Sequence, residues 1–108
     1  MGRKVKWTRA AQNDLVQVAE YISMDSGRRA AQVIRKSLLA ARSLARFADR
    51  GRMVPEFSDP SVRELLKGRY RIIYKISDKC AIVVAFIHGA RDLPALWKKR
   101  ARQNGEDE

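Results

Sequence analysis

One segment of the chain, from Val62 to Pro94, carries a set of side chains that could bind anions or move protons together. Arginine carries a permanent positive charge and five N–H donors, so it binds the oxygens of phosphate and carboxylate groups. His88 is the only histidine, and its unperturbed pKa of about 6.5 suits acid–base work. The candidates in this segment are Arg63, Glu64, Arg69, Arg71, His88 and Arg91.

The pattern around Arg71 predicts a strand with two different faces. Apolar residues at 70, 72, 74 and 76 alternate with Arg69, Arg71 and Lys75, so one face is expected to be apolar and the other to carry positive charge. The charged face could be a solvated surface, or it could bind an antitoxin or a target. A turn at 77–79 leads to Cys80–Ile87, whose apolar residues fall on both faces, as in a central strand covered on two sides. A loop with glycine and proline, Arg50 to Pro60, precedes the sheet.

The N-terminal half predicts a strand followed by two helices. Polar and apolar residues alternate over Lys4–Trp7, and the Thr8 hydroxyl can cap a following helix that stops near Ser26-Gly27. A second helix follows, with Gly51 after its end, and the two helices form an αα-hairpin. The first helix is expected to bury Ala11, Leu15, Val18, Ala19 and Ile22, and the second Ala30, Ile34, Leu38, Ala41, Ala45 and Ala48.

The element order predicts an α+β fold: an N-terminal strand, a helical hairpin, a three-stranded antiparallel meander and a short C-terminal helix from about Leu93 to Gln103. The helices are expected on one face of the sheet. The 108 residues suit a single domain, assigned to 1–103, with a disordered acidic tail at 104–108. Asp92 and Pro94 are well placed to start the last helix, and Trp97 to anchor it on the sheet.

The composition predicts a soluble, cytoplasmic protein with an acidic partner. The formal net charge of +11 favours polyanions or acidic protein surfaces. Cys80 is the only cysteine, so no internal disulfide forms, and it is expected to act as a small apolar residue. No stretch approaches the roughly 18–20 apolar residues of a membrane-spanning helix. The absence of a His/Cys cluster at ligand spacing predicts neither metal nor cofactor.

Four segments in this order resemble the RelE/ParE superfamily of toxins from bacterial type II toxin–antitoxin systems. They are KWTRAAQNDLVQVAEYI, GRMVPE, RELLKGRYRIIYKI and IVVAFIHGARDLP, and the resemblance covers nearly the whole chain. It implies a RelE/ParE-like fold and a hetero-oligomer with a cognate acidic antitoxin. The antitoxin is expected to wrap the toxin with a segment that folds on binding.

The resemblance leaves two activities open. RelE-like members cleave messenger RNA on the ribosome. The resemblance to them implies that Arg71 and Arg91 match two of their arginines and that Arg63 lies near the position of a lysine. Trp97 stands where a catalytic tyrosine is expected, and Leu65 near a second lysine. Since an indole N–H cannot accept a proton, a ribonuclease would need His88 or Glu64 as its base.

ParE-like members inhibit DNA gyrase instead, and the tail IHGARDLPALWKKRARQ resembles theirs more closely. Gyrase inhibition is therefore the preferred interpretation, with ribosome-dependent RNA cleavage as the alternative and a non-toxic nucleic-acid-binding domain as the second. A toxin that keeps only antitoxin binding also stays open. The residues expected to bind target or antitoxin are Arg63, Arg69, Arg71, Arg91, Trp97, Lys98, Lys99 and Arg100, with Arg102 in the same basic cluster.

Overall fold

The structure, a computed structural model, describes residues 2–107, with side chains through Arg102. Its elements are β1 (Lys4–Trp7), α1 (Arg9–Ser23), α2 (Gly27–Arg42), short 3₁₀ turns at Ser43–Ala45 and Ala48–Arg50, β2 (Arg52–Met53), β3 (Val62–Lys67), β4 (Tyr70–Ile76), β5 (Cys80–His88) and α3 (Leu93–Asp107). The helix assignment thus extends past the expected end at Gln103. Glu108 and the side chains from Gln103 onward, which include the predicted acidic tail, lie outside the description.

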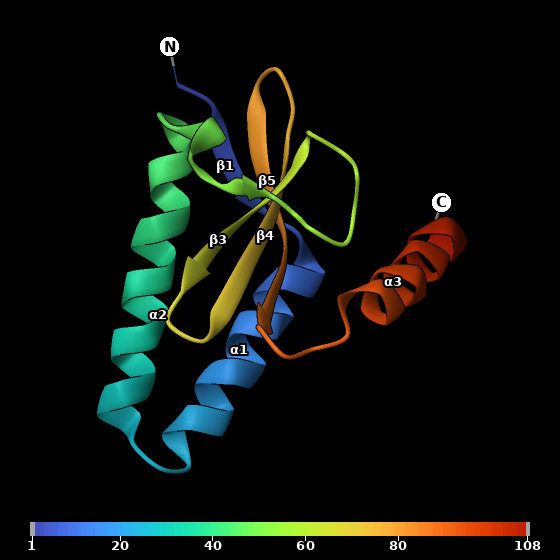
Figure 1. Cartoon of the computed structure of the whole chain (residues 1–108). Coiled ribbons are helices and arrows are strands. Elements are labelled where there is room, and N and C mark those ends of the chain that lie inside the picture. The colour runs from blue at the N-terminus through green and yellow to red at the C-terminus, as the bar shows by residue number, and fades with distance from the viewer. Residues whose placement is uncertain (1, 108) are drawn as a thin grey trace.

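The strands form one five-stranded sheet in the order β1-β5-β4-β3-β2 (Figure 1). β1 runs parallel to β5, and the other neighbouring pairs are antiparallel. This confirms the predicted N-terminal strand and three-stranded meander. The two-residue β2 lies inside the segment that was expected to be a loop. It was not predicted, because two residues are too few to show an alternating pattern.

Gly68 makes the tight turn between β3 and β4 possible. Lys67 pairs with Tyr70, which leaves only Gly68 and Arg69 in the turn. Gly68 has a φ of +59°, the left-handed region that a residue without a Cβ enters at little cost. The turn brings the charged ends of both strands to one rim of the sheet.

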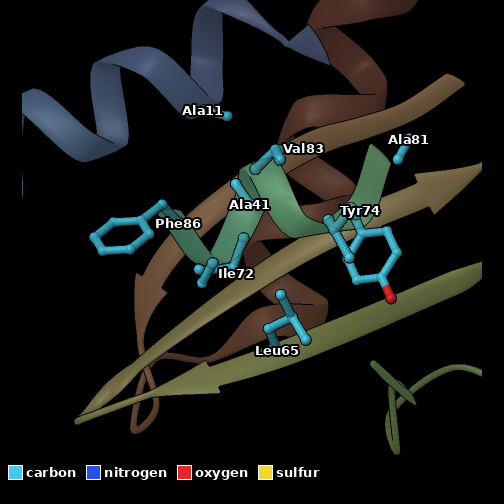
Figure 2. Close-up of a cluster of buried hydrophobic side chains, with 10 residues drawn as sticks. Ala11, Ala41, Leu65, Ile72, Tyr74, Ala81, Val83 and Phe86 are labelled. Atoms are coloured by element: carbon cyan, nitrogen blue, oxygen red, sulfur yellow. The ribbon is translucent and has the colours of Figure 1, made fainter. Parts of the chain in front are cut away.

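The helical hairpin of α1 and α2 covers one face of the sheet, and its side chains form the larger core (Figure 2). Thr8 and Ser26 cap the two helices by accepting hydrogen bonds from backbone N–H groups, both at 3.1 Å. The core contains Ala11, Ala40 and Ala41 from the hairpin and Leu44 from the 3₁₀ turn after it. Its residues from the sheet include Leu65, Ile72, Tyr74, Ala81, Val83 and Phe86. The hairpin prediction is therefore confirmed.

The predicted buried face of α2 was partly wrong. Leu38 is 45% exposed, whereas Ser37 and Ala40, absent from the expected stripe, are buried. Steps of four residues drift by about 40° around a helix of 3.6 residues per turn, so positions 30, 34 and 38 leave the face that position 30 buries. The helix also stops at Arg42, and the chain reaches Ala48 through 3₁₀ turns rather than continuous α-helix.

The opposite face of the sheet is covered by α3 and by the loop after β2, which corrects the expectation of helices on one face only. Leu93 and Leu96 of α3 pack with Val54 of the loop and with Val62 of β3 over Ile73. β5 contributes to both cores, as predicted for a central strand covered on two sides. A bulge at Val84 shifts its pairing with β4, so Val83 and Phe86 face the hairpin while Ala85 and Ile87 face α3.

Candidate functional site: a neutralised arginine and two basic surfaces

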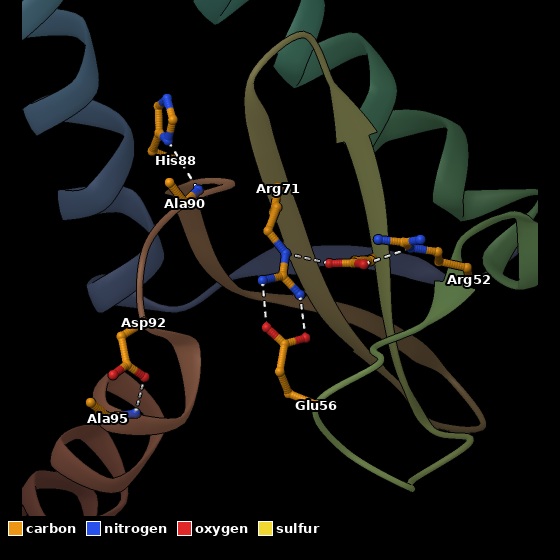
Figure 3. Close-up of polar contacts among 8 residues, drawn as sticks. Arg52, Glu56, Arg71, His88, Ala90, Asp92 and Ala95 are labelled. Carbon is orange, nitrogen blue, oxygen red and sulfur yellow. Dashed lines mark hydrogen bonds and ion pairs between the residues drawn. The ribbon is translucent and has the colours of Figure 1, made fainter.

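Arg71 lies at the centre of a network of ion pairs on the α3 face of the sheet (Figure 3). Its Nε donates to Glu64 at 2.6 Å, and its Nη1 and Nη2 donate to the two carboxylate oxygens of Glu56 at 2.8 Å each. Arg52 donates to the other oxygen of Glu64 at 2.7 Å. Two guanidinium groups thus face two carboxylates, and the four side chains carry no net charge.

The interpretation of Arg71 as part of a solvated surface was wrong, since the residue is only 6% exposed. Hydrogen bonding to Glu56 and then to Glu64 raises its pKa, and the guanidinium beside Glu56 holds the pKa of that carboxyl below its usual range. Both effects favour the charged forms. Arg71 is thereby occupied on all three of its nitrogens by carboxylates of its own chain.

Glu64 and Arg63 are likewise engaged by their surroundings. The Glu64 side chain is fully buried and accepts from two guanidinium groups, so in this arrangement it does not face a substrate as a base. Arg63 is half-buried and donates to the backbone carbonyls of Gly51 at 3.0 Å and Pro60 at 3.1 Å. Arg63 therefore ties the two ends of the loop to β3.

His88 and Arg91 lie apart from this network. His88 pairs with Tyr70 at the register position next to Arg71, and neighbouring positions of a strand point to opposite faces. Figure 3 shows the His88 ring directed away from Arg71. Its Nδ1 accepts from the backbone N–H of Ala90 at 3.1 Å, which leaves the proton of the neutral ring on Nε2.

The pocket beside His88 is small and has an aromatic floor. It measures about 330 Å³ and lies between α1 and the ends of β4 and β5. Tyr70 and Phe86 stack in this pocket with ring centroids 5.3 Å apart, and His88 meets Tyr70 edge-on at 5.7 Å. Arg91 is exposed at the same pocket. Two of the candidate catalytic residues, His88 and Arg91, thus line one pocket, and Arg71 and Glu64 do not line it.

The start of α3 agrees with the sequence prediction. The Asp92 carboxylate accepts from the backbone N–H of Ala95 at 3.1 Å, and Pro94 lies in the first turn. Trp97 packs on Phe57 with ring centroids 4.8 Å apart, and the ammonium of Lys75 lies 5.5 Å from the Trp97 ring. Trp97 thereby fixes α3 to the loop and to the sheet, as predicted.

Arg100 departs from the predicted basic cluster because it turns toward the core. It donates to the Asp14 carboxylate at 2.5 Å and to the backbone carbonyl of Val84 at 2.9 Å. Asp14 also accepts from the N–H of Phe86 at 3.0 Å. Since β1 pairs with β5 only as far as Val83, these two side chains satisfy the open edge of β5 beyond it.

Asp14 was missed by the sequence reasoning. The available signal was a carboxylate at position 14 among the apolar residues of α1, where it is buried. Lys98, Lys99 and Arg102 are exposed and form the outward side of α3. We call these three residues the α3 basic patch.

A larger groove of about 1,220 Å³ runs between the helical hairpin and the β3–β4 turn. Apolar side chains along it include Tyr21, Met24, Val33, Leu66 and Tyr70, and its cations are Arg29, Lys36, Lys67 and Arg69. Tyr21 and Met24 are 75% and 84% exposed. Ser37, which is buried, also lines the groove, and its hydroxyl has no hydrogen-bond partner among the described residues.

Within residues 2–107, no helix is long and apolar enough to cross a membrane. The described part of the chain also contains no group of three or more His, Cys, Asp or Glu side chains placed to hold a metal ion.

Comparison with solved structures defines the class of the fold. The chain superimposes on a structure of a chromosomal ParDE toxin–antitoxin system from P. aeruginosa with a TM-score of 0.68 and 21% identity, over 80% of this chain and 95% of that chain. It also matches the RelBE2 toxin–antitoxin complex from Mycobacterium tuberculosis, with a TM-score of 0.60 and 19% identity, over 82% and 99%. The fold is that of the ParE and RelE toxins.

The sequence then assigns the family within this class. A model of the family described as the ParE toxin of the type II toxin–antitoxin system parDE matches residues 5–93. The chain therefore belongs to the ParE toxin family, which confirms the predicted resemblance. No curated protein sequence matches it significantly.

Proposed function

We propose that this toxin acts by binding and inhibiting DNA gyrase, and not by cleaving RNA. The observation that carries this proposal is the separation of Arg71 from His88, which lie on opposite faces of the sheet. Cleavage through a 2′-hydroxyl requires a base, an acid and a cation around one phosphate. Arg71 instead holds Glu56 and Glu64, and His88 lies on the other side of the strand. The chain belongs to the ParE toxin family, and the resemblance to ParE-like toxins implies gyrase inhibition, which agrees with this choice.

The α3 basic patch is our candidate for the contact with gyrase or its bound DNA. Its cations are exposed on a helix whose inner side is held by Trp97 and Arg100, so the patch has a fixed position. Exposed cations of this kind attract acidic surfaces and phosphates, and they raise association rates. Trp97 itself serves to position the helix.

A pair of charge-reversal variants tests this contact. Lys98→Glu with Lys99→Glu is expected to weaken inhibition of gyrase supercoiling by at least about tenfold, because attraction becomes repulsion at the interface. Lys4→Glu with Lys6→Glu makes the same charge change at exposed positions of β1 and serves as the control. Equal effects of both pairs would show that only net charge matters and would remove the patch from the proposal.

We further propose that the groove beside the hairpin binds a cognate acidic antitoxin. Its exposed apolar side chains suit the apolar positions of a segment that folds on binding, and its four cations suit the carboxylates of that segment. Binding is therefore expected to weaken strongly as salt rises. An antitoxin affinity that is unchanged between low and high salt would contradict the electrostatic part.

One observation favours the alternative, ribosome-dependent RNA cleavage. Arg91 and His88 are exposed beside an aromatic floor, an arrangement that can stack a base and contact a phosphate. In that case His88 would have to exchange its bond to Ala90 for a role as base. Cleavage of messenger RNA by the purified toxin, abolished by His88→Gln, would support this alternative.

A further inference from the structure

The two outer nitrogens of Arg71 are held by the more exposed of its two carboxylate partners. Exposure increases outward through the ion-pair network, with side-chain values of 0% for Glu64, 7% for Arg71 and 30% for Glu56. Glu64 binds Nε from inside the fold, whereas Glu56 reaches Nη1 and Nη2 from the loop after β2. Glu56 therefore covers the Arg71 fork, by which we mean its two Nη groups, from the solvent side (Figure 3).

Glu56 can leave the fork without unfolding the loop. Val54, the first residue of the loop, is fully buried, and Phe57 of the loop packs on Trp97. Arg63 holds the backbone carbonyls of Gly51 and Pro60 at the two ends. These contacts are independent of the Glu56 carboxylate, so rotation of its side chain alone uncovers the fork.

The surroundings of the fork suit an acidic segment with apolar residues. Leu66 stands directly opposite Arg71 on the same face of the sheet and is 55% exposed. Leu66 and the exposed Arg69 also line the large groove. The fork is thus continuous, through the β3–β4 turn, with the groove proposed for the antitoxin.

We propose that the Arg71 fork is a binding site for a carboxylate of an acidic protein partner, and that Glu56 occupies this site in the free toxin. The geometry favours a carboxylate, because two oxygens of one carboxylate already satisfy both nitrogens at 2.8 Å. Once Glu56 turns away, the remaining Arg52, Glu64 and Arg71 carry one net positive charge, which one incoming carboxylate neutralises. The identity of that partner as the antitoxin rests on the proposed function.

Glu56 then acts as an internal competitor that weakens partner binding. A ligand that needs a partly populated state binds more weakly in proportion to that population. If the fork is free about one tenth of the time, removing the competitor strengthens binding about tenfold. The substitution Glu56→Gln removes the charge of the competitor but keeps its size and an oxygen acceptor, so the fold is expected to persist.

The test measures the affinity of a fluorescein-labelled peptide of alternating glutamate and leucine for the wild type and three variants. Glu56→Gln is expected to bind about tenfold more tightly than the wild type, and Glu20→Gln, an equal charge change at an exposed position of α1, much less. Adding Arg71→Lys to Glu56→Gln keeps the charge but removes the fork, and is expected to abolish the gain. Equal gains for Glu56→Gln and Glu20→Gln would overturn the proposal.

A second probe separates carboxylate from phosphate. A single-stranded DNA oligonucleotide that gains more affinity from Glu56→Gln than the peptide does would overturn the assignment to a protein carboxylate. Should the double variant not fold, the comparison of Glu56→Gln with Glu20→Gln decides by itself. Because these assays contain neither gyrase nor antitoxin, their result is independent of the failure or success of the gyrase proposal.

Discussion

The hydroxyl of Tyr74 fixes the start of the loop that carries Arg52 and Glu56. It donates to the backbone carbonyl of Ala48 at 2.6 Å and accepts from the N–H of Gly51 at 3.0 Å, all within the core. Tyr74→Phe would leave both backbone groups buried without a partner. Each such loss costs about 1–2 kcal/mol, so we expect a destabilisation of about 2–4 kcal/mol.

Thermal unfolding followed by circular dichroism measures this loss. For a domain of about 100 residues, 2–4 kcal/mol lowers the melting temperature by about 10–20 °C. Tyr21→Phe is the matched control, because that side chain is 75% exposed and its loss should shift stability by less than about 0.5 kcal/mol. A melting temperature for Tyr74→Phe within about 2 °C of the wild type would refute this description of the loop anchor.

The difference in stability between the wild type and Tyr74→Phe should also depend on pH in alkaline solution. Burial raises the pKa of Tyr74 above its ordinary value of 10.0. A raised pKa in the folded state adds stability below the unfolded pKa, and that stability is lost as pH rises through the folded pKa. The advantage of the wild type over Tyr74→Phe should therefore shrink above pH 10, as measured by urea unfolding. An advantage that is constant up to pH 11 would contradict the burial of this hydroxyl.

Three further predictions concern the same framework. Gly51→Ala should destabilise the protein by about 1–3 kcal/mol, since the new Cβ would lie 2.7 Å from a backbone carbonyl of β3 and even closer to the tyrosine hydroxyl; an unchanged urea midpoint would contradict this. Arg100→Gln should cost about 2–4 kcal/mol by leaving Asp14 buried without its cation, whereas Lys98→Gln should be nearly neutral; equal costs would place Arg100 in solvent. The paired guanidinium lowers the pKa of Glu56, so the stability that this carboxylate adds should be present above about pH 4.5 and lost as pH falls below it. The wild type should therefore lose more stability than Glu56→Gln between pH 5 and pH 3. Parallel losses would contradict the pairing.

Much of the framework could be predicted from local patterns. The alternation at Lys4–Trp7, the Thr8 cap and the Asp92 cap each depend on a few neighbouring residues, and each was confirmed. The hairpin and the meander followed from the same kind of signal. The exposure of Leu38 could not be predicted in this way, because the periodicity of a helix determines its amphipathic face only to within one position.

The state of the candidate site depends on distant pairings that no local pattern contains. Arg71 meets Glu56 and Glu64 from positions 15 and 7 residues away, and only the folding of the loop over β4 brings the more distant carboxylate to it. Asp14 and Arg100 are 86 positions apart. An alternating pattern identified Arg71 as facing away from the hairpin, but it could not reveal which residues cover that face.

The most direct test of the central claim compares two assays on purified toxin free of antitoxin. One measures DNA supercoiling by gyrase, and the other measures the integrity of messenger RNA on translating ribosomes. Our account predicts inhibited supercoiling and intact RNA, because Arg71 and His88 lie on opposite faces of the sheet and the α3 basic patch is exposed. RNA that is cut only when ribosomes are present, with supercoiling unaffected, would contradict the account and direct attention to His88 and Arg91.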